Sequence, residues 1–217
     1  RLSEIVPIYD DKGYCYDHDD GVRADSSLEK LAKLSPVFDP HYGQVTAGNS
    51  SQISDGACYV VLASAKAVAQ YQWPVLGELV DYSWAALDPR RMGLGPAHAI
   101  APLLTRNQLT LPDIDYWEIN EAFAAQVLAC IEALASDHYC QNKLGLAKAL
   151  GSLPLDRLNV DGGAIACGHP VGASGARITL HLLEVLRARK AKQGIASLCI
   201  GGGQGGAVLL RTDSKGA

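Results

Sequence analysis

The sequence predicts an α/β layered fold with a mixed, mainly parallel sheet, and three features of the chain support this class. From Trp73 onward, short apolar runs typical of strands alternate with longer segments that have a helical period. Glycine-rich turns separate these segments. The last two strand-like runs follow each other closely, so we expect a closing hairpin that adds one antiparallel strand to an otherwise parallel sheet.

Composition restricts the class of protein. The 217 residues suffice for a large domain with a substantial core, and 48% are apolar and 19% charged, as in ordinary globular proteins. A net charge of −4 gives no reason to expect nucleic acid or a membrane as a partner, and no apolar run reaches the roughly 20 residues of a membrane span. The chain begins at Arg1 without a signal-peptide pattern, which is typical of a fragment or a processed product.

The cysteines and acidic residues show no metal-binding pattern. The six cysteines are widely spaced, and none forms a CxxC pair: Cys15, Cys58, Cys130, Cys140, Cys167 and Cys199. We therefore expect neither a metal nor a disulfide framework, and a reducing compartment such as the cytoplasm, or the mitochondrion or peroxisome of a eukaryote. The run "DHDDG" (17–21) fits no register of an EF-hand loop and is interpreted as a solvated loop.

The expected elements follow in order along the chain. Residues 1–45 are polar and irregular, with a short helical pattern at 27–34, and residues 46–72 predict a turn, an apolar strand at 56–64 and a short helix. Beyond them, strands are expected at 75–82, 116–119, 158–161, 195–200 and 207–211. Helices are expected from Pro96, over 121–135 and over 174–190, with a long polar segment at 136–156.

A glycine pattern near the end of the chain matches the dinucleotide-binding fingerprint, but we reject that interpretation. Gly201, Gly203 and Gly206 match the spacing G-x-G-x-x-G. The fingerprint requires a helix after the glycines, because the pyrophosphate sits on the N-terminus of that helix. A strand follows here instead, so the glycines more plausibly bring the backbone close to a reacting group next to Cys199.

Three side chains lie at the carboxyl ends of expected strands, where open α/β sheets place their sites. Asn120 follows the strand "YWEI", His169 lies in a glycine-rich loop before a helix, and Cys199 ends the strand "ASLCI". Each also has a structural interpretation. Asn120 suits a helix N-cap, His169 a polar position in a tight turn, and Cys199 an inert buried thiol.

Together, these segments resemble the thiolase family. The resemblance runs from about residue 27 to residue 211, with motifs in the family's order: "VTAGNSSQISDGA" (45–57), "MGLGPAHA" (92–99), "NEAFAAQ" (120–126), "GGAIACGHPVGASGAR" (162–177) and "CIGGGQGGA" (199–207). It implies a fold of two βαβαβαββ halves plus a loop domain. By this resemblance residues 1–45 are a remnant of the loop domain, residues 46–72 the final strand and helix of the first half, and residues 73–217 the complete carboxyl-terminal half.

The resemblance also implies an activity, the making or breaking of the carbon–carbon bond in a 3-ketoacyl-CoA thioester. Cys199 would be the base, His169 and a water held by Asn120 would form an oxyanion hole, and the Gly201 N–H would serve a second one. Three residues match positions that line the family's pantetheine channel: Ala47, Ser51 and Phe123. Acyl-CoA would be substrate rather than cofactor, and no other cofactor is expected.

No segment of the chain resembles the surroundings of the family's nucleophilic cysteine. We therefore expect the chain to be inactive alone, to need the amino-terminal half of a thiolase for turnover, and to form a homo-oligomer when complete. The alternative is a non-catalytic thiolase-like module that binds acyl-CoA or a protein. Retention of Asn120, His169 and Cys199 together favours the enzyme, because a pure binding module would not require all three.

Overall fold

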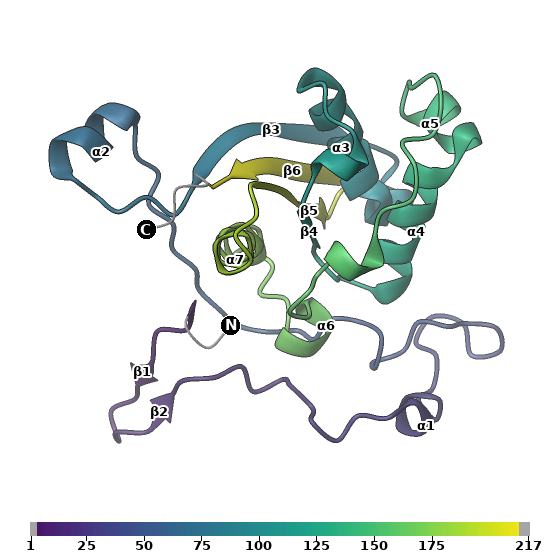
Figure 1. Cartoon of the computed structure of the whole chain (residues 1–217). Helices are drawn as coiled ribbons and strands as arrows, with labels where there is room; N and C mark the ends of the chain where they lie inside the picture. The colour runs from purple at the N-terminus through teal and green to yellow at the C-terminus, as the bar shows by residue number, and fades with distance from the viewer. Residues whose placement is uncertain (1–3, 213–217) are drawn as a thin grey trace.

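A four-stranded sheet forms the centre of the computed structural model, which describes residues 4–212 (Figure 1). The strand order is β3–β6–β5–β4. The strands are β3 (Glu78–Ala86), β4 (Tyr116–Ile119), β5 (Gln193–Ile200) and β6 (Gln204–Arg211). Strand β6 pairs antiparallel with β3 and β5, whereas β4 and β5 pair in parallel. Three strands thus run in one direction and β6 opposes them, which confirms a mixed sheet with an antiparallel hairpin strand; among the described strands, one pairing is parallel and two are antiparallel.

One face of the sheet is covered by α3 (Gly95–Arg106) and α4 (Ala124–Ala135). The buried core on this side includes Trp117, Ile119, Ile195 and Leu209 from the strands and Ile100, Leu103, Leu104, Ile131 and Leu134 from the helices. The start of α3 lies directly on β6, since a β-carbon at Gly205 would collide with the backbone of Gly95. Two glycines therefore set the distance between this helix and the sheet.

The other face of the sheet is only partly covered. Helix α7 (Ser174–Ala188) packs its apolar stripe there, with Ile178, Leu182 and Leu186 next to Ala196 and Leu210. Tyr82 is the register partner of Val208, which packs in the same cluster, so Tyr82 and Trp84 belong to this face. Their exposures of 55% and 68% show that α7 leaves the β3 end of this face open.

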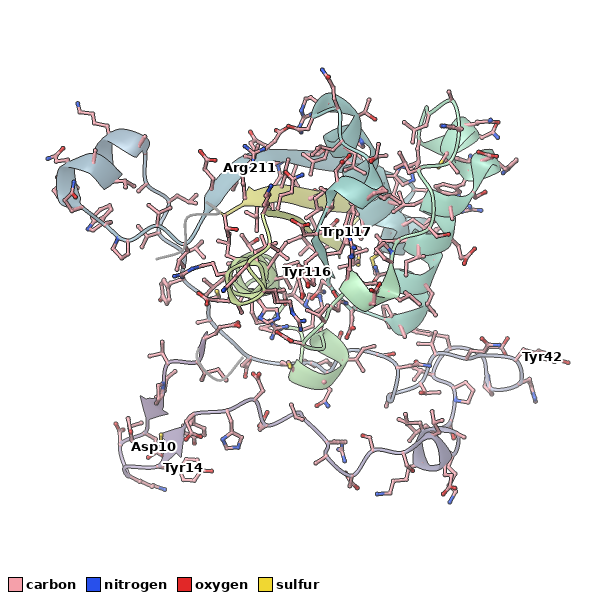
Figure 2. The ribbon with its side chains drawn as sticks, in the orientation of Figure 1. Asp10, Tyr14, Tyr42, Tyr116, Trp117 and Arg211 are labelled. Atoms are coloured by element: carbon pink, nitrogen blue, oxygen red, sulfur yellow. The ribbon has the colours of Figure 1, made fainter. Side chains whose placement is uncertain are left out.

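The amino-terminal segment runs along one side of the layered core and is largely exposed (Figure 1). It contains β1 (Ile8–Tyr9), β2 (Cys15–Tyr16), α1 (Leu28–Leu31) and α2 (Ala65–Tyr71). Tyr14 and Tyr42 project from opposite ends of this segment (Figure 2). Within residues 4–212, no helix is long and apolar enough to cross a membrane.

The remaining elements are short and connect the layers. They are η2 (Pro89–Leu94), η3 (Leu111–Asp113), α5 (Asp137–Lys143), η4 (Leu155–Arg157) and α6 (Ala164–Cys167). Helix α5 lies within the polar segment 136–156, and η4 spans the end of that segment. Residues 1–3 and 213–217, which the expected outer domains include, lie outside the described residues.

The strand expected at 56–64 does not form. These residues are extended coil, and Tyr59, Val61 and Leu62 are exposed by 90%, 82% and 78%. A strand needs a neighbour to satisfy its backbone N–H and C=O groups. Among residues 4–212 no other strand pairs with this segment, so its apolar pattern has no sheet to join.

The strand expected at 158–161 is reduced to a single parallel bridge between Leu158 and Trp117. Asn159 interrupts it, because its φ of 46° lies in the left-handed region. The Asn159 side chain replaces the missing ladder by accepting a hydrogen bond from the Ile119 N–H and donating one to the Ile119 carbonyl, each at 2.9 Å. Between residues 73 and 212 the chain therefore has four strands rather than the five expected.

Candidate active site

A glycine-rich loop brings His169 to the beginning of α7. The single turn α6 (Ala164–Cys167) ends at Gly168, whose φ of 83° favours glycine. A β-carbon at Gly168 would also collide with Ser54. The Arg177 guanidinium then donates a 2.7 Å hydrogen bond to the Gly168 carbonyl. The glycines of this motif thus fold the loop tightly enough to fix the backbone just before the histidine.

The His169 imidazole has a defined proton arrangement. Its Nδ1 lies 2.6 Å from the Ser174 hydroxyl, and that hydroxyl donates to the Pro170 carbonyl at 3.1 Å. With its one proton used, the Ser174 oxygen accepts from Nδ1–H, so Nε2 keeps its lone pair. Burial, and then the charge of Arg177, lower the pKa of His169. The residue is therefore a neutral imidazole whose Nε2 can accept a proton.

Asn120 lies against this ring. Its Nδ2 atom is 3.3 Å from Nε2 of His169, and its backbone N–H donates to the Ser197 carbonyl on β5 at 2.9 Å. The Asn120 side chain is buried, and its Oδ1 atom has no hydrogen-bond partner among residues 4–212. A buried carbonyl oxygen of this kind can accept a hydrogen bond from a water or a ligand.

The N-cap interpretation of Asn120 is wrong. Helix α4 begins at Ala124 rather than at residue 121, and Phe123 occupies the N-cap position. The residues between Asn120 and the helix stay outside it because their backbone pairs with another segment. Ser51 N–H donates to the Ala122 carbonyl and Ala124 N–H donates to the Asn49 carbonyl. The Asn120 side chain is left free to face the histidine.

Cys199 lies near the end of β5 and is buried. Burial raises the pKa of its thiol, and a backbone hydrogen bond offsets only part of this effect, so the thiol is protonated at neutral pH. Its side chain shares the Ile195 face of the strand, which α3 and α4 cover. Within the described residues no hydrogen bond joins the thiol to His169 or Asn120. The placement of Asn120, His169 and Cys199 at the carboxyl ends of strands predicts that all three line one cleft, and this stays a prediction.

The residues matched to the pantetheine channel lie on neighbouring segments. An antiparallel bridge joins Ser50 to Phe123, which places Ser51 beside the start of α4. Ala47 is exposed on the same amino-terminal segment. Gly201 is exposed in the turn between β5 and β6, and a β-carbon there would meet open space. The structure therefore brings Ser51 and Phe123 together but shows no contact of Ala47 or Gly201 with them.

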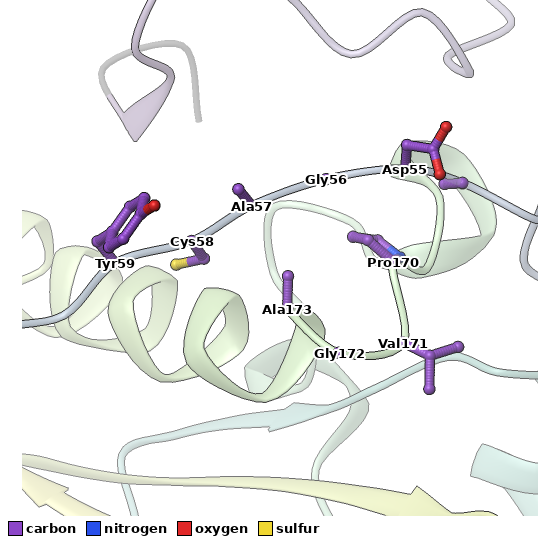
Figure 3. A pocket seen from close by; sticks show the side chains of 10 residues that line it. Asp55, Gly56, Ala57, Cys58, Tyr59, Pro170, Val171, Gly172 and Ala173 are labelled. Atoms are coloured by element: carbon purple, nitrogen blue, oxygen red, sulfur yellow. The ribbon is translucent and has the colours of Figure 1, made fainter.

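A cavity of about 390 Å³ opens beside the histidine loop (Figure 3). Residues 54–59 form one wall and residues 170–173, which follow His169, form the other. Figure 3 shows the extended chain from Asp55 to Tyr59 crossing the beginning of α7. Within residues 4–212, no group of three or more His, Cys, Asp or Glu side chains could hold a metal ion.

Four side chains around the site were not identified from the sequence. Ser54 accepts a 3.2 Å hydrogen bond from the His169 N–H, and Ser174 contacts the ring. Glu121 and Asn159 link the His169 loop to the end of β4 through side-chain hydrogen bonds. Ser54, Glu121 and Ser174 lie within the quoted motifs, and this position is a signal in the sequence. The partners of Ser54 and Glu121 are distant in sequence, whereas Ser174 contacts a histidine of its own motif. Only the fold shows what these polar groups contact.

The family model described as "Thiolase, C-terminal domain" matches residues 73–212, and "Thiolase, N-terminal domain" matches residues 2–66. The chain belongs to the thiolase family. Its resemblance to that family and its layered α/β fold are thereby confirmed.

Similar proteins share both sequence and structure with the chain. The peroxisomal 3-ketoacyl-CoA thiolase B of Rattus norvegicus is 43% identical over 96% of this chain and 47% of its own length. An acetyl-CoA acetyltransferase of Bacillus anthracis aligns with a TM-score of 0.83 and 40% identity over 96% of this chain and 49% of that one. Human mitochondrial 3-ketoacyl-CoA thiolase, in complex with CoA, has a TM-score of 0.79 and 38% identity over 95% and 48%. The chain spans about half the length of these relatives.

Proposed function

We propose that this chain supplies the general base and oxyanion-hole residues of a thiolase-type acyltransferase, which forms or cleaves the carbon–carbon bond of a 3-ketoacyl-CoA with acetyl-CoA. The observation that carries the proposal is the contact between Asn120 and His169, which joins two family motifs at the carboxyl edge of the sheet. Several relatives are named 3-ketoacyl-CoA thiolases, which fits a place in fatty acid β-oxidation.

The reaction requires proton transfer at a carbon next to a thioester carbonyl and stabilisation of the resulting enolate oxygen. The Nε2 lone pair of His169 accepts a proton from the nucleophilic cysteine of the other half. The resulting N–H then donates to the thioester oxygen. The unpartnered Oδ1 of Asn120 suits a water that completes this oxyanion hole. The tautomer set by Ser174 supports this assignment, because it leaves Nε2 as the reactive nitrogen.

Cys199 transfers the second proton. In the cleavage direction its neutral thiol donates a proton to the carbanion of the departing acetyl-CoA, and in the condensation direction the thiolate removes that proton. The raised pKa of the buried thiol favours the proton-donating state at rest. The Gly201 N–H serves the second oxyanion hole together with the nucleophilic cysteine.

The amino-terminal half of a thiolase is the proposed partner. The chain spans about half of its relatives, and its exposed apolar side chains, including Tyr59, Val61, Leu62 and Trp84, would be covered by a second α/β half. We infer that the complete protein binds CoA thioesters along Ala47, Ser51 and Phe123, and that it forms a homo-oligomer. One relative crystallised with CoA, and the peroxisomal thiolase of Saccharomyces cerevisiae is described as dimeric. Peroxisomal and mitochondrial relatives make those compartments candidates beside the cytoplasm.

Incubation of the isolated chain with acetyl-CoA, followed by intact-mass analysis and a thiolysis assay, tests the proposal. We expect neither an acyl-enzyme nor cleavage of acetoacetyl-CoA, because acyl transfer needs the nucleophile of the other half. Addition of a separately expressed amino-terminal half should restore thiolysis, and Cys199→Ala should abolish the restored activity. Cys140→Ala is the control, since that thiol is buried between helices α4 and α5. Turnover by the chain alone, or full activity of Cys199→Ala, would contradict the proposal.

A further inference from the structure

We propose that Glu121 and Asn159 are positioning residues, whose side chains hold the His169 loop in place relative to the strand end that bears Asn120. The inference rests on the proposed function for its catalytic consequence. Among the described residues, neither side chain is hydrogen-bonded to the His169 ring, so both act through the backbone of the loop. The first two of the three steps in this connection are hydrogen bonds between residues about 40 positions apart in the chain.

The first step joins Asn159 to the end of β4. Its side-chain amide binds both backbone groups of Ile119, accepting from N–H and donating to C=O at 2.9 Å. Its own backbone N–H donates to the Trp117 carbonyl at 2.9 Å. Ile119 immediately precedes Asn120, so these three bonds fix the backbone from which the Asn120 amide projects.

The second step joins Asn159 to Glu121 and Glu121 to α6. The Asn159 amide nitrogen donates to Glu121 Oε1 at 3.1 Å, and the other carboxylate oxygen accepts from the Ile165 N–H at 3.2 Å. A β-carbon at Gly163 would collide with this carboxylate, so the glycine makes the close approach possible. The carboxylate therefore holds the N-terminal end of α6.

The third step runs through α6 to the histidine. This single helical turn ends at Cys167, and its closing residue Gly168 precedes His169 directly. Gly168 N–H donates to the Ala164 carbonyl at 2.9 Å, so the turn is internally bonded. A shift of the turn on β4 would move the imidazole relative to Asn120, from which its Nε2 is separated by 3.3 Å. Loss of the bridge should therefore change the geometry of the site without removing any group from it.

Two variants remove the bridge in different ways. Glu121→Gln keeps the size of the side chain. Its amide N–H, however, points toward one of the two groups that donate hydrogen bonds to the carboxylate, the Asn159 amide or the Ile165 N–H. Asn159→Gly removes the amide and tolerates the positive φ at this position. Glu132→Gln, an exposed carboxylate on α4, is the matched control for charge.

The first readout is independent of activity. Long-range ¹H–¹⁵N spectra of the full chain report the tautomer and titration midpoint of His169. We expect Glu121→Gln and Asn159→Gly to move the His169 nitrogen resonances, and Glu132→Gln to leave them in place. Should neither variant move them while both remain folded, the positioning role is overturned. If one variant fails to fold, the other decides the question, and if both unfold, the bridge is a folding element and the proposal is rejected.

The second readout is thiolysis after addition of the amino-terminal half. We expect kcat to fall roughly 10- to 100-fold in both variants, as for misplacement of a catalytic group, with KM for CoA unchanged. A change in KM with kcat unchanged would contradict the inference. If the wild-type chain shows no activity in this assay, the proposed function fails, whereas the His169 spectra still test the bridge.

Discussion

Nδ1 of His169 lies 2.6 Å from the Ser174 hydroxyl, and this contact ties the ring to the first turn of α7. The hydroxyl is fully buried and donates onward to the Pro170 carbonyl. Nε2, which is 3.3 Å from the Asn120 amide nitrogen compared with 3.5 Å for Nδ1, is consequently the ring nitrogen without a proton. The catalytic properties proposed for His169 thus depend on a serine five residues further along the chain.

Ser174→Ala should disturb the tautomer of His169. The Nδ1–H loses its buried acceptor, which should cost about 1 to 3 kcal/mol of unfolding free energy and lower the restored thiolysis roughly 10- to 100-fold. Chemical denaturation and steady-state kinetics measure the two effects. Thr179→Val is the control, because the Thr179 hydroxyl makes a similar bond to the Gly175 carbonyl on the same helix. An equal loss of activity in both variants would assign the effect to the helix instead.

Asn120→Asp should lower the restored thiolysis sharply while the isolated chain stays folded. A carboxylate beside His169 removes the amide donor and stabilises the protonated imidazole, so the pKa of His169 should rise above that of the wild-type chain. NMR titration of His169 and the pH profile of kcat check this result. Unchanged turnover and an unchanged titration would show that Asn120 has only a structural role.

The stability of the chain should decrease as the pH falls below about 6.5. Burial and then Arg177 lower the pKa of His169 in the folded state, so the unfolded chain takes up this proton first, near the ordinary value of 6.5. The stabilisation is present above pH 6.5 and is lost as the pH falls toward the folded-state pKa. Unfolding free energies between pH 7.5 and 5.5, measured by urea denaturation, should therefore depend less on pH in His169→Gln.

His41→Gln serves as the control for this prediction, since His41 is exposed in the amino-terminal segment. Its unfolding free energy should keep the pH dependence of the wild-type chain. His98→Gln should reduce the slope independently, because burial, and then Lys143, lower the pKa of His98 as well. A slope in His169→Gln equal to that of the wild type would contradict the assignment.

The isolated chain should self-associate. Val61 and Trp84 are exposed by 82% and 68%, in a segment without a strand partner and on the open part of the sheet. Apolar patches of this kind promote association. Sedimentation velocity over a concentration series should show association that the double variant Val61→Lys, Trp84→Lys reduces. Leu155→Lys changes an exposed apolar residue outside both regions and should leave the association constant unchanged. If Leu155→Lys weakens association as much as the double variant does, the effect comes from added charge in general.

Local sequence determined those carboxyl-terminal elements whose apolar side chains are buried within the carboxyl-terminal unit itself. The strand at 116–119 was predicted with the bounds that β4 has, and α7 begins at Ser174 as expected, because their apolar side chains meet partners within the same layered unit. The motifs also indicated Asn120 and His169, which the fold brings into contact. Residues of these types at the ends of strands are a local signal, readable without coordinates.

Tertiary structure decided the features that depend on distant partners. The run at 56–64 has the composition of a strand but no neighbouring strand, and Asn159 adopts a positive φ while its side chain replaces the ladder bonds of Ile119. The tautomer of His169 follows from Ser174 and Pro170, and the raised pKa of Cys199 follows from burial. Hydrogen bonding and desolvation depend on which groups meet in space. Sequence spacing alone therefore indicated the candidate residues, while folding set their protonation and contacts.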